Sequence, residues 1–264
     1  MNSKKQNGAI IYKGPSMLDG APIVVIVTGL AQTSKNAKTG DMLQTWILRE
    51  DVAPNIAIKT GQDGSICGNC PHRGHYTHDD NGKGFWQRTR TCYVQVHNAP
   101  LSVWKAYKRG NYADLTDNAD ATARLGERRI VRLGSYGDPM AAPRRVWEYL
   151  IAFASGWTGY THQWETVAQE PVERDQWQKL VMASADNEAQ GASAQARGWR
   201  TFRVMASGDT HKRASEALCP ASKEGGHKST CAECKLCMGT TTKARKSVSI
   251  YVHGSGANAF SRAA

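Results

Sequence analysis

The sequence predicts an α/β fold, a partial (β/α) barrel of parallel strands with a cysteine-rich C-terminal extension. Two observations predict it. Short apolar strands alternate with helix-length segments between Leu101 and Met205, which is the pattern of βαβ units. The composition then changes to Gly, Lys and Cys before one last apolar strand. We expect an N-terminal extension with the first strands at 1–60, a barrel-like core at 61–210 and a Cys-rich auxiliary segment at 211–264.

The first part of the chain is expected to hold two strands and a long loop. A buried strand over Ile23–Val27 begins the fold, since the residues before it form a short basic leader. A second strand is expected over Leu43–Leu48. Gly61–Arg90 is rich in Gly, His, Asp and Asn and is expected to be a loop. Long loops inside compact domains are usually functional.

The alternation itself begins after this loop. Its best-defined helix opens at Pro143, places Trp147, Leu150, Ile151 and Ala154 at i, i+3, i+4 and i+7, and closes at Gly156. The other expected elements are helices over Leu101–Gly110, Val172–Gln178 and Asn187–Arg197, and strands over Ile130–Leu133, Trp157–Trp164, Lys179–Ala183, Trp199–Met205 and Ser247–Val252.

Composition excludes two classes of protein. Hydrophobic residues make up 40% of the chain and the mean hydropathy is -0.53, so disorder is excluded as the main state. The longest apolar stretch, Pro22–Ala31, is about half of the roughly 20 residues that a membrane-spanning helix needs. Met1–Lys13 lacks the apolar region of a signal peptide. A cytoplasmic protein is therefore expected, in the host cytoplasm if a phage encodes it.

The charge balance indicates an anionic partner. Lys and Arg number 34 against 23 Asp and Glu, a net charge of +11, which suits a nucleotide or nucleic acid as well as an ordinary basic surface. The chain has no phosphate loop of P-loop type, no G-x-S-x-G elbow and no H-E-x-x-H motif. Many of the basic residues lie in the tail: Lys212, Arg213, Lys223, Lys228, Lys235, Lys243, Arg245 and Lys246.

The last four cysteines are spaced C-x11-C-x2-C-x2-C, at Cys219, Cys231, Cys234 and Cys237. Seven cysteines in all leave one over from a complete set of disulfides, so metal ligation is the leading interpretation. Four sulfurs complete a closed site, and three at successive two-residue gaps resemble ferredoxin-type runs more than zinc fingers. This spacing favours an iron–sulfur cluster over zinc, in a structural role.

The first three cysteines, Cys67, Cys70 and Cys92, form a separate group. Three thiolates on a four-iron cluster leave one iron without a protein ligand, and that iron is open to a small molecule. The alternatives are a Cys3His zinc site and histidines that merely decorate a solvated loop. The histidines near these cysteines are His72, His75, His78 and His97.

Two motifs resemble the radical SAM superfamily: Cys92 followed directly by Tyr93, and a strand that ends in Gly134-Ser135-Tyr136-Gly137-Asp138-Pro139. The resemblance implies that the three cysteines hold a [4Fe-4S] cluster, that Tyr93 packs near the adenine of S-adenosylmethionine, and that Gly137, Asp138 and Pro139 bind the methionyl amino group, with Asp in place of Glu. The Cys-rich tail resembles the auxiliary-cluster extensions of some members.

The cysteine spacing departs from the usual C-x3-C-x2-C of that superfamily, because 21 residues separate Cys70 from Cys92. Closing a longer loop costs little extra entropy, so ligation by Cys92 stays open. In this respect the arrangement resembles more closely that of uncharacterised phage and mobile-element proteins whose scattered cysteines end in a Cys-Tyr pair, and a phage origin is expected.

Polar residues at strand ends supply the remaining candidates, since ligands collect at the carboxyl ends of parallel strands. Tyr160 and His162 lie toward the end of the strand over Trp157–Trp164, and Asp186 follows the strand over Lys179–Ala183. Arg203 lies on the strand over Trp199–Met205, and these four are the catalytic candidates. Ser184 matches the ribose-contacting position of the superfamily by strand order. Asp186 serves equally as a helix N-cap, and His162 as a structural histidine.

The resulting hypothesis is an iron–sulfur enzyme that reductively cleaves S-adenosylmethionine to modify a nucleotide or nucleic acid. It implies one open and one auxiliary [4Fe-4S] cluster and an electron donor. The alternative is a zinc-binding, replication-associated phage protein that binds nucleic acid through its basic tail and has no enzymatic activity.

Overall fold

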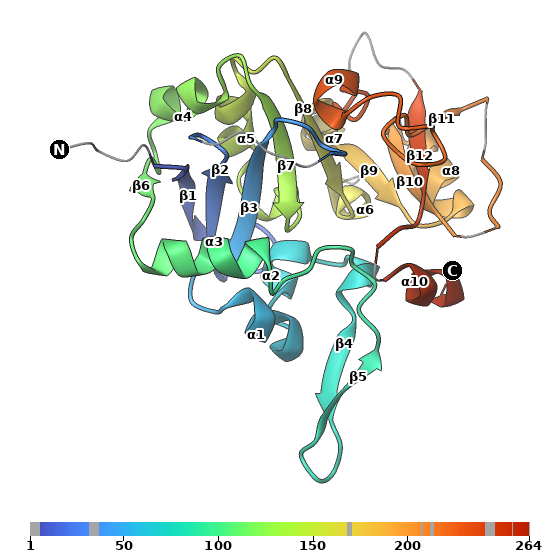
Figure 1. Ribbon diagram of the computed structural model, residues 1–264, viewed down its shortest axis with the longest axis horizontal. Coiled ribbons are helices and arrows are strands. Elements are labelled where there is room, and N and C mark those ends of the chain that lie inside the picture. Colours follow the sequence, from blue (N-terminus) through green and yellow to red (C-terminus); the bar gives the residue numbers. More distant parts are fainter. Residues whose placement is uncertain are drawn as a thin grey trace.

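The computed structural model describes residues 6–31, 37–167, 171–206, 208–211, 214–240, 246–254 and 256–263. A ten-stranded sheet runs through the molecule, with the order β11-β12-β10-β9-β8-β7-β3-β2-β1-β6 (Figure 1). The strands are β1 (Gly8–Pro15), β2 (Pro22–Thr28), β3 (Leu43–Arg49), β6 (Ala113–Asp114), β7 (Ile130–Tyr136), β8 (Gly156–Thr161), β9 (Met182–Ala185), β10 (Thr201–Met205), β11 (Glu216–Leu218) and β12 (Ser247–Tyr251). A separate hairpin consists of β4 (His75–His78) and β5 (Gly84–Arg88).

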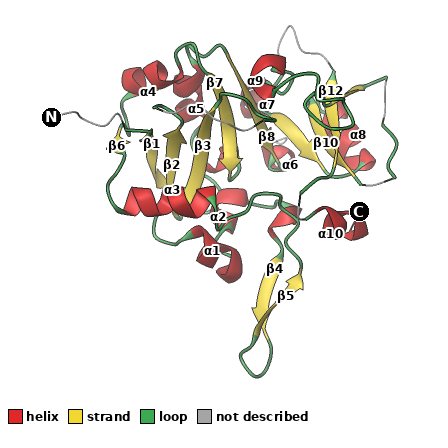
Figure 2. Cartoon of the chain, in the orientation of Figure 1, coloured by secondary structure: helices red, strands yellow, loops and turns green. Residues whose placement is uncertain are grey.

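Helices connect and flank the strands (Figure 2). They are α1 (Pro54–Thr60), α2 (Gly64–Cys67), α3 (Ala99–Lys108), α4 (Ala119–Gly126), α5 (Arg144–Ile151), α6 (Trp164–Val167), α7 (Pro171–Leu180), α8 (Glu188–Ala196), α9 (Cys231–Cys234) and α10 (Ala257–Ala263). Two short 3-10 turns, η1 (Pro71–Arg73) and η2 (Pro139–Ala141), follow Cys70 and Asp138. In the residues described, no helix has the length and apolar character to cross a membrane.

The predicted α/β class with parallel strands is confirmed. Every neighbouring pair from β3 through β7, β8, β9, β10 and β12 to β11 is parallel. The strand β2 runs antiparallel to both β1 and β3. Strands from all three expected sequence regions belong to this one sheet, whose two edges, among the described strands, are β6 and β11.

The start of the fold was predicted too late. The supposed leader contains β1, in which Ile10, Ile11 and Tyr12 are buried and pair with β2. Its apolar run is short and is followed by Lys13, so the segment alone resembles a basic leader. Burial between β2 on one side and β6 on the other is what makes it a strand.

The helix that opens after Pro143 also differs from its prediction. Its apolar face is buried through Trp147 and Leu150, as expected, but α5 ends at Ile151. The last turn is tightened there, because the N–H of Ala152 bonds to the carbonyl of Tyr149 and that of Ala154 to the carbonyl of Ile151. Gly156 consequently opens β8 rather than closing the helix.

Two apolar clusters hold the sheet together. The larger one joins β1, β2, β3 and β7 to α5. The indole N–H of its fully buried Trp147 donates to the carbonyl of Pro139 at 2.8 Å, which fixes the turn after β7. The smaller cluster lies at the other end of the sheet and contains Met182, Cys219, Val248 and Ile250. Both clusters therefore anchor segments that reach the candidate site.

Candidate functional site

A single cavity of about 400 Å³ is lined by all seven cysteines. Its wall is one face of the parallel sheet, because alternate residues of a strand point to the same side. Residues that follow β7 and β8, among them Asp138 and His162, line it as well, so it extends to the carboxyl ends of these strands. The strand residues in its wall include Arg132, Gly134, Thr158, Tyr160, Phe202, Val204, Val248 and Ile250.

The early cysteine group, Cys67, Cys70 and Cys92, comes from two segments. Cys67 ends α2 and Cys70 precedes η1, while Cys92 follows the hairpin β4–β5. The backbone N–H groups of Thr91 and Cys92 donate to the carbonyl of His72 at 3.2 and 3.1 Å. Cys92 thus returns to the turn beside Cys70, despite the 21 intervening residues.

The expected long loop is therefore wrong, because its middle is a β-hairpin that projects from the sheet (Figure 1). The turn is closed by Asp79, whose carboxylate accepts from the N–H groups of Asn81 and Lys83 at 3.0 and 2.8 Å. Gly82 has φ +77, which glycine adopts without strain. Asn81-Gly82 is a strong hairpin signal, and it was the sequence feature that could have predicted this return of the chain.

Burial raises the pKa of two of the early cysteines, Cys67 and Cys92. Burial raises the pKa of Cys67 well above its usual value, and neighbouring Cys70 raises it further. Burial also raises the pKa of Cys92, although Arg90 opposes the shift. A metal that binds here displaces the protons of these two thiols.

The distances between the cysteine sulfurs bear on which metal they can hold. A single tetrahedral zinc with bonds of about 2.3 Å holds its sulfurs roughly 3.8 Å apart. Throughout the described ranges, no set of three ligand atoms within 4.8 Å of one another includes a cysteine. No three of the described cysteine sulfurs thus stand at the spacing of ligands to one zinc ion.

The turn after β7, which contains the Gly137-Asp138-Pro139 motif of the sequence analysis, borders the cavity. Gly137 has φ +86, and a Cβ at this position would lie 2.7 Å from the Cβ of Ile47. The carboxylate of Asp138 accepts from Thr161 Oγ1 at 2.8 Å and from the N–H of His162 at 2.8 Å. Its side chain thus ties β7 to β8. Gly137, Asp138, Tyr93 and Ser184 line the cavity, whereas Pro139 is buried behind it.

Tyr93 is oriented by a cation from β7. Its hydroxyl hydrogen-bonds Arg132, whose guanidinium lies 5.8 Å from the centre of the Tyr93 ring. Burial by itself lowers the pKa of Arg132, but Tyr93 and Tyr160 outweigh this effect and raise it. The guanidinium therefore stays charged within the cavity wall.

The late cysteine group, Cys219, Cys231, Cys234 and Cys237, is built around α9. Thr230 and Glu233 form a capping box at its N-terminus, and the N–H of Cys231 donates to the carbonyl of Lys38 at 2.9 Å. Burial and the other late cysteines raise the pKa of Cys237 to about 12, although the hydrogen bond with Tyr160 opposes the shift.

Tyr160 contacts the late cysteine group. Its hydroxyl hydrogen-bonds Cys237, and burial raises its pKa well above the usual value. Its ring packs on Phe202 with the centroids 4.3 Å apart. The residue thus forms part of the wall between the sheet and the late cysteines.

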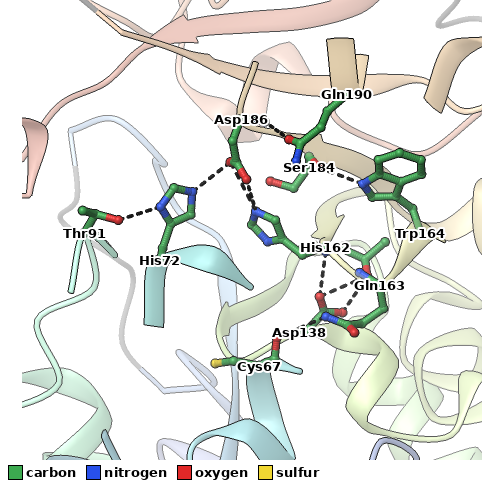
Figure 3. A network of polar contacts seen from close by, with 11 residues as sticks. Cys67, His72, Thr91, Asp138, His162, Gln163, Trp164, Ser184, Asp186 and Gln190 are labelled. Carbon is green, nitrogen blue, oxygen red and sulfur yellow. Dashed lines mark hydrogen bonds and ion pairs between the residues drawn. The ribbon is translucent and has the colours of Figure 1, made fainter. Parts of the chain in front are cut away.

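Three polar residues, His72, His162 and Asp186, meet beside the early cysteine group (Figure 3). His72 Nε2 lies 2.8 Å from Asp186 Oδ1, and His162 Nε2 lies 3.4 Å from the same carboxylate. The hydrogen bonds to the two histidines outweigh burial and hold the pKa of Asp186 well below its usual value. Burial alone lowers the pKa of His162, but Cys70 and Asp186 raise it well above its usual value.

The alternative in which Asp186 caps a helix is wrong. The N-cap of α8 is Asn187, whose side chain accepts from the N–H of Gln190 at 2.9 Å. Asp186 is consequently free to turn toward the two histidines. His72 was considered as a zinc ligand and His162 as a catalytic residue, but their meeting across Asp186 had no sequence signal.

Arg203 lies away from the cavity. Its neighbours on β10, Phe202 and Val204, line the cavity, so strand alternation points Arg203 to the other side. There it forms a buried ion pair with Glu216 at 2.8 Å, which joins β10 to β11. The structure thus gives this candidate a structural role.

Three further histidines lie outside the cavity lining, and one basic residue of the tail, Lys235, belongs to it. His75 and His78 lie on the hairpin and His97 is exposed, and none of the three lines the cavity. Among the basic tail residues, Lys212, Arg213, Lys243 and Arg245 lie outside the described residues.

Comparison with known proteins adds no relative. No family model matches the chain, and neither the curated proteins nor the solved structures contain a match. The residues of the cavity are therefore the basis for inferring a function.

Proposed function

We propose that the chain is an iron–sulfur enzyme of the radical SAM type. Cys67, Cys70 and Cys92 hold a [4Fe-4S] cluster with one iron open to S-adenosylmethionine, and the late cysteine group holds an auxiliary cluster. The observation that carries the proposal is the return of Cys92 to the turn beside Cys70, on the wall of a cavity that the Gly137–Asp138 turn also borders.

We further propose that the sheet curves around this cavity as a partial (β/α) barrel. Alternate residues of β7, β8, β10 and β12 line the cavity, as the inward-facing side chains of a barrel do. The parallel order from β3 to β12 supports this arrangement, with the early cysteines following its first strand.

The number of sulfurs assigns the two roles. Three thiols leave one iron of a four-iron cluster without a protein ligand, whereas four thiols complete their cluster. Such a cluster, when bound at the early group, supplies the single electron that cleaves S-adenosylmethionine into methionine and an adenosyl radical, which abstracts hydrogen from the substrate. An external electron donor supplies that electron.

The surrounding side chains bind and orient. Tyr93 offers a ring beside the early group, held by Arg132, on which an adenine packs. Backbone groups of the Gly137–Asp138 turn face the cavity for the amino group, since the Asp138 carboxylate is already bonded within the protein.

The same cavity suits an anionic, aromatic substrate. Arg132 and Lys38 line it together with the paired rings of Tyr160 and Phe202. Cations and aromatic faces together favour a nucleotide or a nucleic-acid base. The free thiols fit a reducing compartment, and we propose the cytoplasm, that of the host if a phage encodes the chain.

The test is anaerobic reconstitution with iron and sulfide, followed by reduction in the presence of S-adenosylmethionine. We expect about four iron atoms per cluster, visible sulfur-to-iron charge transfer, and reductant-dependent release of 5′-deoxyadenosine. Cys67→Ala abolishes this release. Thr77→Ala, on the hairpin strand β4 and outside the cavity lining, leaves it unchanged.

Zinc without iron in the oxygen-free preparation, together with no 5′-deoxyadenosine, would refute the proposal. The alternative zinc-binding, non-enzymatic nucleic-acid protein would then be supported by nucleic-acid binding that weakens steeply as salt rises.

A further inference from the structure

We propose that His72, His162 and Asp186 bind a divalent transition-metal ion, at a site distinct from both cysteine groups. One ligand atom from each residue lies within 4.8 Å of the other two, and within the part of the chain that the structure describes this is the one such set from His, Cys, Asp and Glu. The three residues come from η1, from the end of β8 and from the end of β9 (Figure 3).

The donor set is that of a metal site. Two imidazole nitrogens and one carboxylate suit first-row divalent ions, and the 2-His-1-carboxylate arrangement leaves further coordination positions open. Ligands bonded at about 2.1 Å and at right angles lie roughly 3 Å apart. The separations from Asp186 to His72 and to His162, 2.8 and 3.4 Å, are close to this value.

Neighbouring groups orient the ligands as in a metal site. His72 Nδ1 lies 2.7 Å from Thr91 Oγ1, so that hydrogen bond directs Nε2 toward Asp186. The ring of Phe260 stacks on His72 with the centroids 5.2 Å apart. A bond from the second ring nitrogen is what fixes a metal-binding histidine.

One carboxylate oxygen of the proposed metal site, Asp186 Oδ2, lacks a hydrogen-bond partner within the described ranges, and a bound cation takes that place. Asp186 Oδ2 is buried and has no hydrogen-bond partner among the described residues, and its contact with His162 is an ion pair at 3.4 Å. A buried carboxylate oxygen without such a partner is costly, because it has lost its water. A bound cation removes this cost.

The site is reached from the cavity, since His72 and His162 both line it. The open positions of the metal therefore take an oxygen of the molecule that occupies the cavity. The competing arrangement is a mixed site, because the Cys70 side chain also hydrogen-bonds His162. The experiment has to separate these two ligand sets.

The test uses Co²⁺ as the probe, titrated without oxygen into the untagged full chain after iron–sulfur reconstitution. We expect one Co²⁺ per chain with ligand-field absorption of nitrogen and oxygen donors and no added sulfur-to-cobalt charge transfer. Asp186→Asn, which preserves size, removes this binding, and Thr91→Val weakens it by roughly 10- to 100-fold. His97→Gln, an exposed histidine outside the cavity, has no effect.

The site is excluded if wild type binds no Co²⁺, or if binding survives Asp186→Asn but disappears with Cys70→Ala and shows thiolate charge transfer. Thermal melts of each variant separate unfolding from ligand loss, and the conservative Thr91→Val keeps the test decisive if Asp186→Asn does not fold. Cobalt binding is measured without S-adenosylmethionine, so its result is independent of the proposed enzyme activity.

Discussion

The two cysteine groups share one cavity but are built differently. The early group draws three sulfurs from segments that a hairpin brings together, and it borders the polar contacts of His162 and Asp186. The late group draws four sulfurs from one loop around α9 and borders the apolar cluster with Met182 and Val248. Fewer sulfurs and polar neighbours suit reactivity, whereas a full set in apolar surroundings suits structure.

An arginine side chain donates to backbone carbonyls beside each cysteine group. Arg73 donates to the carbonyls of Gly61 and Gly68 beside the early group. Arg200 is buried and donates to carbonyls in the loop that follows α9, those of Leu236, Met238, Gly239 and Lys246. A different arginine thus ties each cysteine-bearing loop to the fold, and Arg90 adds bonds to the carbonyls of Cys92 and Val94 beside the early group. The two groups can therefore be perturbed separately.

The largest expected effect separates reactivity from structure. Cys92→Ala removes a ligand of the open cluster, so release of 5′-deoxyadenosine falls below detection. Cys234→Ala removes one of four late ligands and leaves that release within a few-fold of wild type. Chromatography of reduced, reconstituted protein checks both, and equal loss in the two variants would contradict the assignment of roles.

The next largest effect is expected when Arg200 or Arg73, the arginines that hold the two cysteine-bearing loops, is replaced. Arg200→Ala leaves several buried carbonyls without a donor, and Arg73→Ala leaves the buried Asp63 carboxylate, 2.8 Å from Arg73 Nη2, without its partner. Each substitution is expected to lower the free energy of unfolding by about 3 kcal/mol. Urea denaturation of metal-free protein measures this change.

The iron content then distinguishes the two arginines. After reconstitution, Arg200→Ala is expected to lose the iron of the late group and Arg73→Ala that of the early group. Loss of both clusters from either variant would show that the two groups do not fold around their metals independently.

The smallest effect lies at the helix that carries two late cysteines. Thr230→Ala breaks the capping box of α9 and costs about 1 kcal/mol. Asn118→Ala, which removes the N-cap of α4 far from the cysteines, is the matched control with a similar cost. Both costs are measured by urea denaturation, and only Thr230→Ala is expected to slow iron incorporation at the late group. Identical iron incorporation in the two variants would argue against a role for the cap in that site.

Much of the fold could be predicted from apolar patterns. The strands at Ile23–Val27 and Ile130–Leu133 appear close to their expected positions, because the first is a continuous apolar run and the second is apolar except for Arg132. The strand β1 was missed because its side chains are buried only through partner strands. The hairpin was missed although Asn81-Gly82 gives a local signal for it. The end of α5 was misplaced because the tightened last turn, closed by bonds from Ala152 and Ala154, leaves no mark in the apolar spacing.

The candidate site residues also divide into those that the sequence selected correctly and those that the structure placed elsewhere. The rule that ligands gather at strand ends selected His162, Asp186 and Ser184, and His162 and Ser184 line the cavity. It also selected Arg203, which the alternation of β10 directs to the opposite face. Sequence position gives the strand, but the face depends on the register that the sheet adopts.

By itself, the sequence determined the α/β alternation and the supply of thiols, because these depend on residue type and local spacing. Tertiary structure alone decided that both cysteine groups face one cavity, that Arg203 faces away from it, and that Asp186 meets two histidines. These contacts join residues far apart in the chain. Strand pairing and burial select them, and no local pattern encodes either.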